Sequence, residues 1–448
     1  MWLINAKTFE RREFVGTSIP DYAVLSHTWG VAEVTFDDMA LAISESPPRK
    51  AGWAKIEGTC RQAVSDKLDW VWVDTCCIDK RSSAELSEAI NSMFAWYRRA
   101  ARCYVYLEDV VLPDDHALEQ SKWFTRGWTL QELLAPTQVF FYDQTWTYIG
   151  RKISSSTTPS SSKQPPGPAK SPADQRFLAR IASITHIPPS VLESPDGFAS
   201  ECTAKKMSWA ASRATTRPED LAYCLMGLFD VNLPILYGEG LRHAFRRLQL
   251  EIMAKTTDHS IFAWDYSLPT SDPRTILAET PAAFRHSAGV TVWGFRDYKP
   301  AGAFIMTNSG LQASFFLSAT RSPTPLALLE CGVRDEDGKH RVAIPLEVCQ
   351  KRKQNSPGLY LRRVDFQYAP AGGGAAGGGG SSLSSSSSGM ASRSKLVTWD
   401  AEGLKLGPWG TGQGAGPEDV VIMESRHHEH WRALMHHSSV RDQLLFTM

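Results

Sequence analysis

Residues 22–26 (YAVLS) and residues 70–74 (WVWVD) are short, nearly continuous apolar runs, and they decide the fold of this chain. Two similar runs follow at 103–107 (CYVYL) and 139–142 (VFFY). Each run is too short for a helix and is rich in β-branched or aromatic residues, which favours β-strands. Because the runs are so apolar, we expect strands that are buried on both faces of a sheet.

Helical patterns separate these strands. Apolar residues recur at helical spacing between residues 56 and 64 and again between 86 and 97. The second helix is preceded by SSAE at 82–85, a capping box in which Ser82 and Glu85 satisfy each other's backbone N–H groups. The alternation of strands and helices predicts that residues 1–152 form an α/β domain with a mostly parallel sheet.

The rest of the chain divides by composition. Residues 153–174 are dominated by Ser, Thr, Pro and Lys, and we expect them to form a loop. Residues 175–265 carry helical patterns and are interpreted as a helical extension of the first domain. Residues 266–448 show short alternating runs and turns, which predict a β-rich accessory domain. The Gly/Ser tract at 371–389 inside it is expected to be a flexible linker.

The composition is that of a globular protein, with 42% hydrophobic and 21% charged residues in a chain of 448. Lys plus Arg and Asp plus Glu both number 48, so no net field favours nucleic acid, and we expect no nucleic-acid partner. No segment reaches the roughly 18 apolar residues that a membrane span needs, and the first residues contain no signal-peptide core. We therefore expect no membrane span and a cytoplasmic location.

The eight cysteines show no C-x-x-C spacing, which argues against a zinc or redox site and fits free thiols in a reducing compartment. The adjacent pair Cys76 and Cys77 would need an activating base to serve as a nucleophile, and His27 is the nearby candidate. Packing is the favoured alternative for this pair. The histidines between 427 and 437 have no fixed metal-ligand geometry, so no metal site is predicted.

Three blocks carry a resemblance to a known family: YAVLSHTWG at 22–30, WVDTCCIDK at 72–80 and RGWTLQEL at 126–133. These are long and chemically unusual strings. They resemble the heterokaryon-incompatibility (HET) family of fungi, and the resemblance extends over most of residues 1–265. It implies an intracellular cell-death effector of nonself recognition.

The HET family is thought to be distantly similar to TIR domains, which implies a flavodoxin-like parallel sheet. TIR enzymes cleave the nicotinamide–ribose bond of NAD with a glutamate in a Trp-x-x-x-Glu-Leu pattern, and residues 128–133 match that pattern. The resemblance thus implies Glu132 as the catalytic candidate and NAD as the substrate, without a cofactor. The alternative is a structural Glu132 that pairs with Arg126 or with a backbone donor.

In a parallel α/β sheet, ligands collect at the carboxyl ends of the strands, where residues 26–30 and 74–80 begin. His27 suits acid–base chemistry, Trp29 suits stacking on a base, and Asp74 suits binding of ribose hydroxyls together with Ser26. The structural alternatives are a loop contact for His27, a plug of the sheet end for Trp29 and a turn for Asp74. The substrate-binding candidates are Ser26, His27, Trp29, Gly30, Asp74, Asp79, Arg126 and Trp128.

The absence of two sequence motifs narrows the range of possible functions. The sequence contains neither a G-x-G-x-x-G fingerprint nor a G-x-x-x-x-G-K-[ST] phosphate loop, which disfavours redox use of NAD and a nucleotide-driven switch within this chain. Two hypotheses remain: an effector that cleaves NAD, and a non-enzymatic signalling module of the same pathway. For either, the expected partners are other death-signalling proteins or a second copy of the chain. A family member without activity is the third reading.

Overall fold

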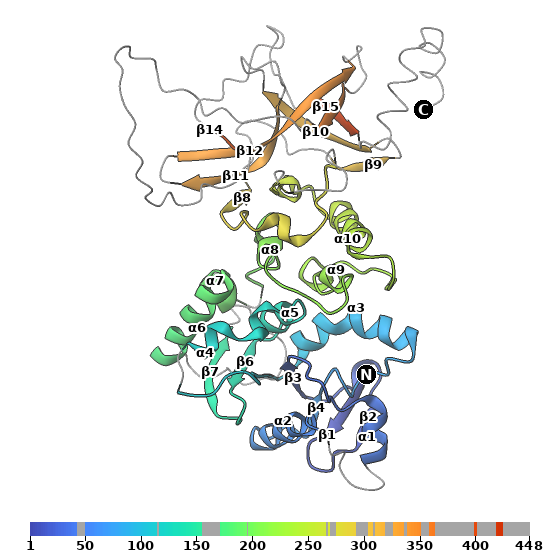
Figure 1. The fold of residues 1–448 in the computed structure, drawn as a ribbon, viewed down its shortest axis with the longest axis vertical. Coiled ribbons are helices and arrows are strands. Elements are labelled where there is room, and N and C mark those ends of the chain that lie inside the picture. The colour runs from blue at the N-terminus through green and yellow to red at the C-terminus, as the bar shows by residue number, and fades with distance from the viewer. Residues whose placement is uncertain are drawn as a thin grey trace, which may run out of the picture. The chain divides into compact units, whose positions relative to one another are not determined.

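The computed structural model describes residues 1–42, 50–113, 116–154, 171–194, 196–265, 268, 275–292, 303–307, 310–318, 326–335, 338–350, 358–362, 398–400 and 418–423 (Figure 1). The chain divides into two compact units. The first contains residues 1–201, 209–252 and 280–282, and the second contains residues 202–208, 253–279 and 283–448. The domain boundaries expected from the sequence, at 152, 174 and 265, stay predictions.

The first unit is built on a sheet of seven strands in the order β2-β1-β4-β3-β5-β6-β7. Its central strands β4, β3, β5 and β6 pair in parallel, whereas β1, β2 and β7 pair antiparallel at the two sides. The strands are β1 (Trp2–Asn5), β2 (Arg11–Glu13), β3 (Ala23–His27), β4 (Trp70–Trp72), β5 (Arg102–Tyr106), β6 (Gln138–Tyr142) and β7 (Tyr148–Ile153).

The parallel core corresponds to the predicted strands, each within two residues of its expected limits. Every residue of β3 is buried, as the unbroken apolar run at 22–26 indicates. The antiparallel strands β1, β2 and β7 were not predicted. The mixed sheet confirms an α/β domain, and the finer likeness to flavodoxin or TIR folds stays a prediction.

The described residues form ten α-helices, and the one at 203–208 belongs to the second unit. They are α1 (Phe36–Ala42), α2 (Trp53–Ser65), α3 (Ser83–Arg99), α4 (Ala117–Gln120), α5 (Thr129–Leu134), α6 (Pro172–Thr185), α7 (Pro189–Glu193), α8 (Thr203–Ser208), α9 (Asp220–Tyr223) and α10 (Leu241–Lys255). The predicted apolar stripes lie on α2 and α3, although Val64 at the end of the first stripe is 41% exposed. Among the described residues, no helix is both long and apolar enough to span a membrane.

The start of α3 departs in one detail from the predicted capping box. The hydroxyl of Ser82 accepts from the backbone N–H of Glu85 at 3.2 Å, as expected. The carboxylate of Glu85 instead accepts from the backbone N–H of Asp79 at 2.9 Å. This contact fixes the loop between β4 and α3, which borders the site described below.

The short helix α5 is tied to the chain at both ends. At its start, the hydroxyl of Thr129 donates to the carbonyls of Trp123, at 2.5 Å, and Arg126, at 2.9 Å. At its end, the buried ammonium of Lys152 donates to the carbonyls of Leu133, at 2.9 Å, and Pro136, at 2.8 Å. The bonds from Lys152 give partners to carbonyl groups at the end of the helix, where intrahelical donors are lacking. The orientation of α5 is therefore fixed from two sides.

The segment before α5 is also joined to the helical extension. The backbone N–H of Gly127 donates to the carbonyl of Ala214 at 2.9 Å, and the N–H of Ala214 donates to the carbonyl of Thr125 at 2.7 Å. An added Cβ at Gly127 would lie only 2.5 Å from the Cγ2 atom of Thr215. The close approach of these two segments therefore requires glycine at this position.

The second unit contains the described strands of the predicted β-rich region. They are β8 (Val290–Val292), β9 (Ile305–Thr307), β10 (Gly310–Ser318), β11 (Leu326–Asp335), β12 (Gly338–Gln350), β13 (Gly358–Arg362), β14 (Thr398–Asp400) and β15 (Glu418–Met423). Most pair antiparallel, and β13 with β15 pairs in parallel. The linker at 371–389, the histidines at 427–437 and most of the predicted loop at 153–174 lie outside the described residues.

We predict that Gly127→Ala destabilises the first unit by roughly 1–3 kcal/mol, because the added methyl group forces the extension away from α5. Gly30→Ala is the matched control, since the nearest atom to its added Cβ would be the Oε1 atom of Glu33 at 3.4 Å. Urea unfolding followed by tryptophan fluorescence measures both variants. Equal midpoints for the two variants would show that the close approach at Gly127 is unimportant.

Candidate functional site

A cavity of about 200 Å³ lies at the edge of the first sheet where the parallel strands β3 and β4 end. The loops after these strands, one face of α3, the helix α5 and parts of the segment 216–237 form its wall. The lining residues are His27, Trp29, Asp74, Ile78, Lys80, Leu86, Ile90, Met93, Arg126, Trp128, Thr129, Glu132, Thr216, Arg217, Asp220 and Tyr237.

The cavity brings together most of the residues that the sequence singled out. Those that line it are His27, Trp29, Asp74, Arg126, Trp128 and Glu132. Those outside its lining are Ser26, Gly30 and Asp79. Residues from all three sequence blocks therefore meet at one place, although more than one hundred positions separate the first from the last.

Glu132 is only 5% exposed, and a hydroxyl group holds its carboxyl. The hydroxyl of Ser26 donates to Oε2 of Glu132, and the indole N–H of Trp123 donates to that same hydroxyl oxygen at 2.8 Å. Ser26 is fully buried, so it lies behind Glu132 and orients it rather than facing the cavity. Arg126 does not pair with Glu132, because its guanidinium contacts the hydroxyl of Thr216 at 3.3 Å.

Burial dominates the electrostatics of Glu132 and raises the pKa of its carboxyl to about 8. The hydrogen bonds from Ser26 and Tyr97 and the charge of Arg213 lower this pKa in part, whereas the negative charge of Asp74 raises it further. A carboxyl group with such a pKa exchanges its proton close to neutral pH. Perturbed carboxyl groups in cavities are candidates for catalysis.

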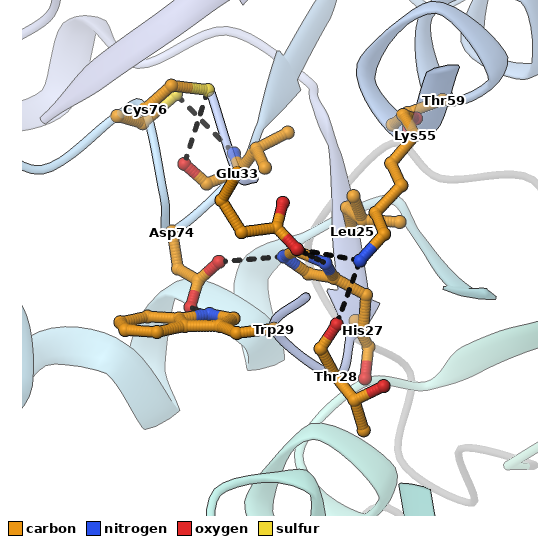
Figure 2. Close-up of polar contacts among 12 residues, drawn as sticks. Leu25, His27, Thr28, Trp29, Glu33, Lys55, Thr59, Asp74 and Cys76 are labelled. Carbon is orange, nitrogen blue, oxygen red and sulfur yellow. Dashed lines mark hydrogen bonds and ion pairs between the residues drawn. The ribbon is translucent and has the colours of Figure 1, made fainter. Parts of the chain in front are cut away.

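A second polar chain runs through His27, Asp74 and Trp29 (Figure 2). The Nε2 atom of His27 lies 3.1 Å from Oδ1 of Asp74, and the indole N–H of Trp29 donates to Oδ2 of Asp74 at 2.8 Å. His27 is buried and contacts a carboxylate, not the loop carbonyl of the structural alternative. Trp29 is 51% exposed, so it does not plug the sheet end.

Asp74 differs from Glu132 in its protonation. Burial alone would raise the pKa of Asp74, but hydrogen bonds from His27 and Trp29 and the charge of Lys80 outweigh burial and lower it. Asp74 therefore stays ionised at neutral pH. Glu132 and Asp74, two of the three acidic side chains that line the cavity, have pKa values shifted in opposite directions, a pattern that enzymes use to assign separate roles to two acids.

A cluster around Lys55 supports the loop after β3, and the sequence did not indicate it. The buried ammonium of Lys55 donates to the carbonyl of Thr28 at 2.9 Å and pairs with Glu33 at 2.7 Å (Figure 2). It also pairs with Glu108 at 3.0 Å. Burial would lower the pKa of Lys55, but these carboxylates raise it overall. Glu33 also lies 3.9 Å from Nδ1 of His27, so the cluster reaches the cavity through that ring.

Gly30 and Asp79 have local roles in the structure. The backbone N–H of Gly30 donates to Glu33 at 2.6 Å, which ties the loop to the Lys55 cluster. Asp79 accepts two bonds from the guanidinium of Arg81, both at 2.9 Å, and this pairing lowers the pKa of Asp79 to about 2. Neither residue lines the cavity, so their contact with a substrate stays a prediction.

The helical extension supplies one side of the cavity, which the sequence did not reveal. The phenol of Tyr237 donates to Asp220 at 3.0 Å, and the guanidinium of Arg217 lies 3.9 Å from the centre of the Tyr237 ring. Burial raises the pKa of Asp220. The resemblance to the HET family extends beyond residue 207, but it does not indicate that this segment contacts the first domain.

The cysteine pair has the properties of packing residues. Cys76 and Cys77 are buried, and burial raises the pKa of the Cys76 thiol well above its usual value. His27 faces Asp74 and so does not activate this thiol. Among the described residues, no three or more His, Cys, Asp or Glu side chains are grouped so as to hold a metal ion.

Comparison with known proteins places part of the chain in a known family. The family model described as heterokaryon incompatibility protein (HET) matches residues 22–114. The resemblance to the HET family that the three sequence blocks indicated is thereby confirmed. A model described as a domain of unknown function (DUF8212) matches residues 243–307 of the same chain.

The relative identified by sequence is the vegetative incompatibility protein HET-E-1 of Podospora anserina, which is 43% identical over the matched region. The match covers 52% of the present chain but only 16% of the relative. No solved structure matches this chain.

We predict that Glu132 makes the stability of the wild type fall as pH rises. The folded state holds the Glu132 proton up to about pH 8, whereas the unfolded state releases it near 4.5. The stabilisation is complete below pH 4.5 and is lost progressively up to pH 8, by at most about 1.4 kcal/mol per pH unit. Glu132→Gln should lack this component when urea unfolding is compared at pH 5.5 and pH 8.

The control for this comparison is Glu57→Gln, which neutralises an exposed carboxylate on α2. Groups that do not interact with Glu132 or Glu57 titrate alike in all three proteins, so the difference between variants isolates the buried carboxyl together with its direct neighbours. Parallel stability curves for wild type and Glu132→Gln would contradict the raised pKa.

Proposed function

We propose that this protein acts in heterokaryon incompatibility as a cell-death effector and that its cavity cleaves the nicotinamide–ribose bond of NAD. The similarity to a vegetative incompatibility protein supports the pathway, and the Trp-x-x-x-Glu-Leu pattern at 128–133 supports the reaction. The observation that carries the proposal is the carboxyl of Glu132, buried and oriented by Ser26 in a cavity lined with aromatic side chains.

Cleavage of the nicotinamide–ribose bond requires little more than one oriented carboxylate. When the bond between ribose C1′ and the nicotinamide nitrogen breaks, its electron pair moves to the ring and neutralises the pyridinium charge. The leaving group therefore needs no proton. Positive charge builds on the ribose, and a carboxylate at the position of Glu132 stabilises it. Water then adds to C1′, and its proton passes to the same carboxylate.

Asp74 is suited to the ribose hydroxyls. Its carboxylate accepts from His27 and Trp29, and each oxygen keeps a lone pair for a further donor. Because Asp74 is ionised at neutral pH, it can accept hydrogen bonds without first losing a proton. Trp29 and Trp128 provide aromatic surface in the same cavity for the nicotinamide ring.

The raised pKa of Glu132 fits a cationic substrate. Without a ligand, burial keeps most of this carboxyl protonated at neutral pH. A nicotinamide ring that carries a positive charge would favour the ionised form once bound, because opposite charges at short distance lower the pKa of an acid. Substrate binding would thus create the catalytic carboxylate.

The cavity volume suits the reacting end of the dinucleotide. Sites that bury a complete drug-sized ligand usually enclose about 300–1,000 Å³. A volume of about 200 Å³ matches a nicotinamide ring with part of its ribose, so the rest of the substrate would extend along the opening.

We predict that the full-length protein, at high concentration, releases nicotinamide from NAD and that Glu132→Gln lowers this rate by roughly 100-fold or more. The substitution keeps the size of the side chain and removes its charge. Chromatography of released nicotinamide measures the rate, with Glu57→Gln as the control that should retain wild-type turnover. No release from folded wild type would support the non-enzymatic signalling module instead.

A second prediction concerns pH. If the ionised form of Glu132 is the active one, kcat/KM should rise about tenfold per pH unit and level off near pH 8. Ser26→Ala removes a hydrogen bond that lowers the pKa of Glu132, so the plateau should move to higher pH. The exposed Ser18→Ala is the control. Identical profiles for the Ser26 variant and the control would exclude an orienting role for Ser26.

A further inference from the structure

Three cationic side chains, Lys80, Arg126 and Arg217, line the cavity and have only neutral contacts. The ammonium of Lys80 lies 3.7 Å from the centre of the Trp29 ring. Arg126 donates to the hydroxyl of Thr216, and Arg217 lies over the ring of Tyr237. Within the described ranges, none of the three cations forms an ion pair with a carboxylate.

This absence of ion pairs contrasts with other basic residues of the same unit. Arg151 pairs with Asp174 at 3.0 Å, and Lys55 pairs with Glu33 at 2.7 Å. The contacts of the cavity cations fix the direction of their side chains without a direct ion pair, although Lys80 and Arg217 lie near enough to Asp74 and Asp220 to lower the pKa values of these acids. Cations that are oriented but not neutralised are a common feature of sites for phosphate and other anions.

The cavity also has a gradient of charge from its interior to its opening. Glu132 is buried inside, whereas Lys80 and Arg217 are exposed and Arg126 is half-buried. The two other lining carboxylates have protein partners, since Asp74 accepts from His27 and Trp29, and Asp220 accepts from Tyr237. Positive charge therefore predominates near the opening.

We infer that Lys80, Arg126 and Arg217 form a diphosphate subsite, so that the ligand of this cavity is an ADP-ribosyl compound rather than a free nucleoside. The identity of the buried end rests on the proposed function. In NAD the cationic nicotinamide is followed by ribose and then by the diphosphate, the same order of charges, reversed in sign, as Glu132 and the three cations. Charge complementarity of this kind fixes the orientation of a ligand.

The test uses the full-length protein and isothermal titration calorimetry with ADP-ribose, adenosine and nicotinamide riboside as probes. Wild type should bind ADP-ribose at least roughly tenfold more tightly than adenosine, because two charge-assisted contacts are gained. The double variant Arg126→Gln with Arg217→Gln should lose that preference and should show a weaker dependence of affinity on salt. The double variant Arg126→Lys with Arg217→Lys keeps the charges and should retain most of the affinity.

Arg61→Gln, an exposed arginine on α2 outside the cavity, is the matched control and should bind as wild type does. Circular dichroism and the unfolding midpoint establish that each variant is folded. The inference is overturned if folded wild type does not bind ADP-ribose, if it binds adenosine equally well, or if the glutamine variant binds like the control.

The test of the diphosphate subsite and the test of NAD cleavage can succeed or fail independently of each other. Phosphate preference in a wild type that releases no nicotinamide would support the subsite and reject the NAD-cleaving activity. Release of nicotinamide with a KM that is unchanged in the glutamine variant would support the activity and reject the subsite. If both hold, KM for NAD should rise about tenfold or more in that variant with a smaller change in kcat.

Discussion

The buried hydrogen bond between Ser26 and Glu132 is the interaction on which the geometry of this site depends. It joins the carboxyl end of β3 to α5, two elements that are distant in sequence. The bond is supported by Trp123, which donates to Ser26, while Lys152 holds the end of α5. A shift of α5 would leave several buried polar groups without partners, at a cost of about 1–3 kcal/mol for each. The scaffold therefore holds the carboxyl in a place where burial opposes its ionisation.

Because burial opposes ionisation, Glu132 and Asp74 differ in their protonation states. At Asp74, hydrogen bonds from His27 and Trp29 outweigh burial and keep the carboxylate charged, whereas at Glu132 burial outweighs the hydrogen bonds and the carboxyl keeps its proton. The Lys55 cluster connects His27 to α2, because Glu33 pairs with Lys55 of that helix and also approaches the Nδ1 atom of His27. A network of this kind holds the loop after β3 through charge-assisted bonds rather than through apolar packing.

The sequence predicted the parallel core because its strands are buried on both faces, and burial leaves a nearly pure apolar run. The edge strands β2 and β7 face solvent in part and carry charged residues such as Arg11 and Lys152, so their patterns are weaker. Candidate residues at strand ends were predictable from the topology of parallel sheets. Partners such as Lys55 and Tyr237 were not, because their contacts depend on how distant segments pack.

The cavity extends over more of the chain than the segment that matches the HET family model. The family model ends at residue 114, before α5 and before the strand β6 that pairs with β5. The matched segment alone would lack Glu132 and would expose the open edge of β5. The backbone bonds between Gly127 and Ala214 extend the requirement into the helical extension. The complete cavity therefore lies within the first compact unit, and the matched segment is only one part of that unit.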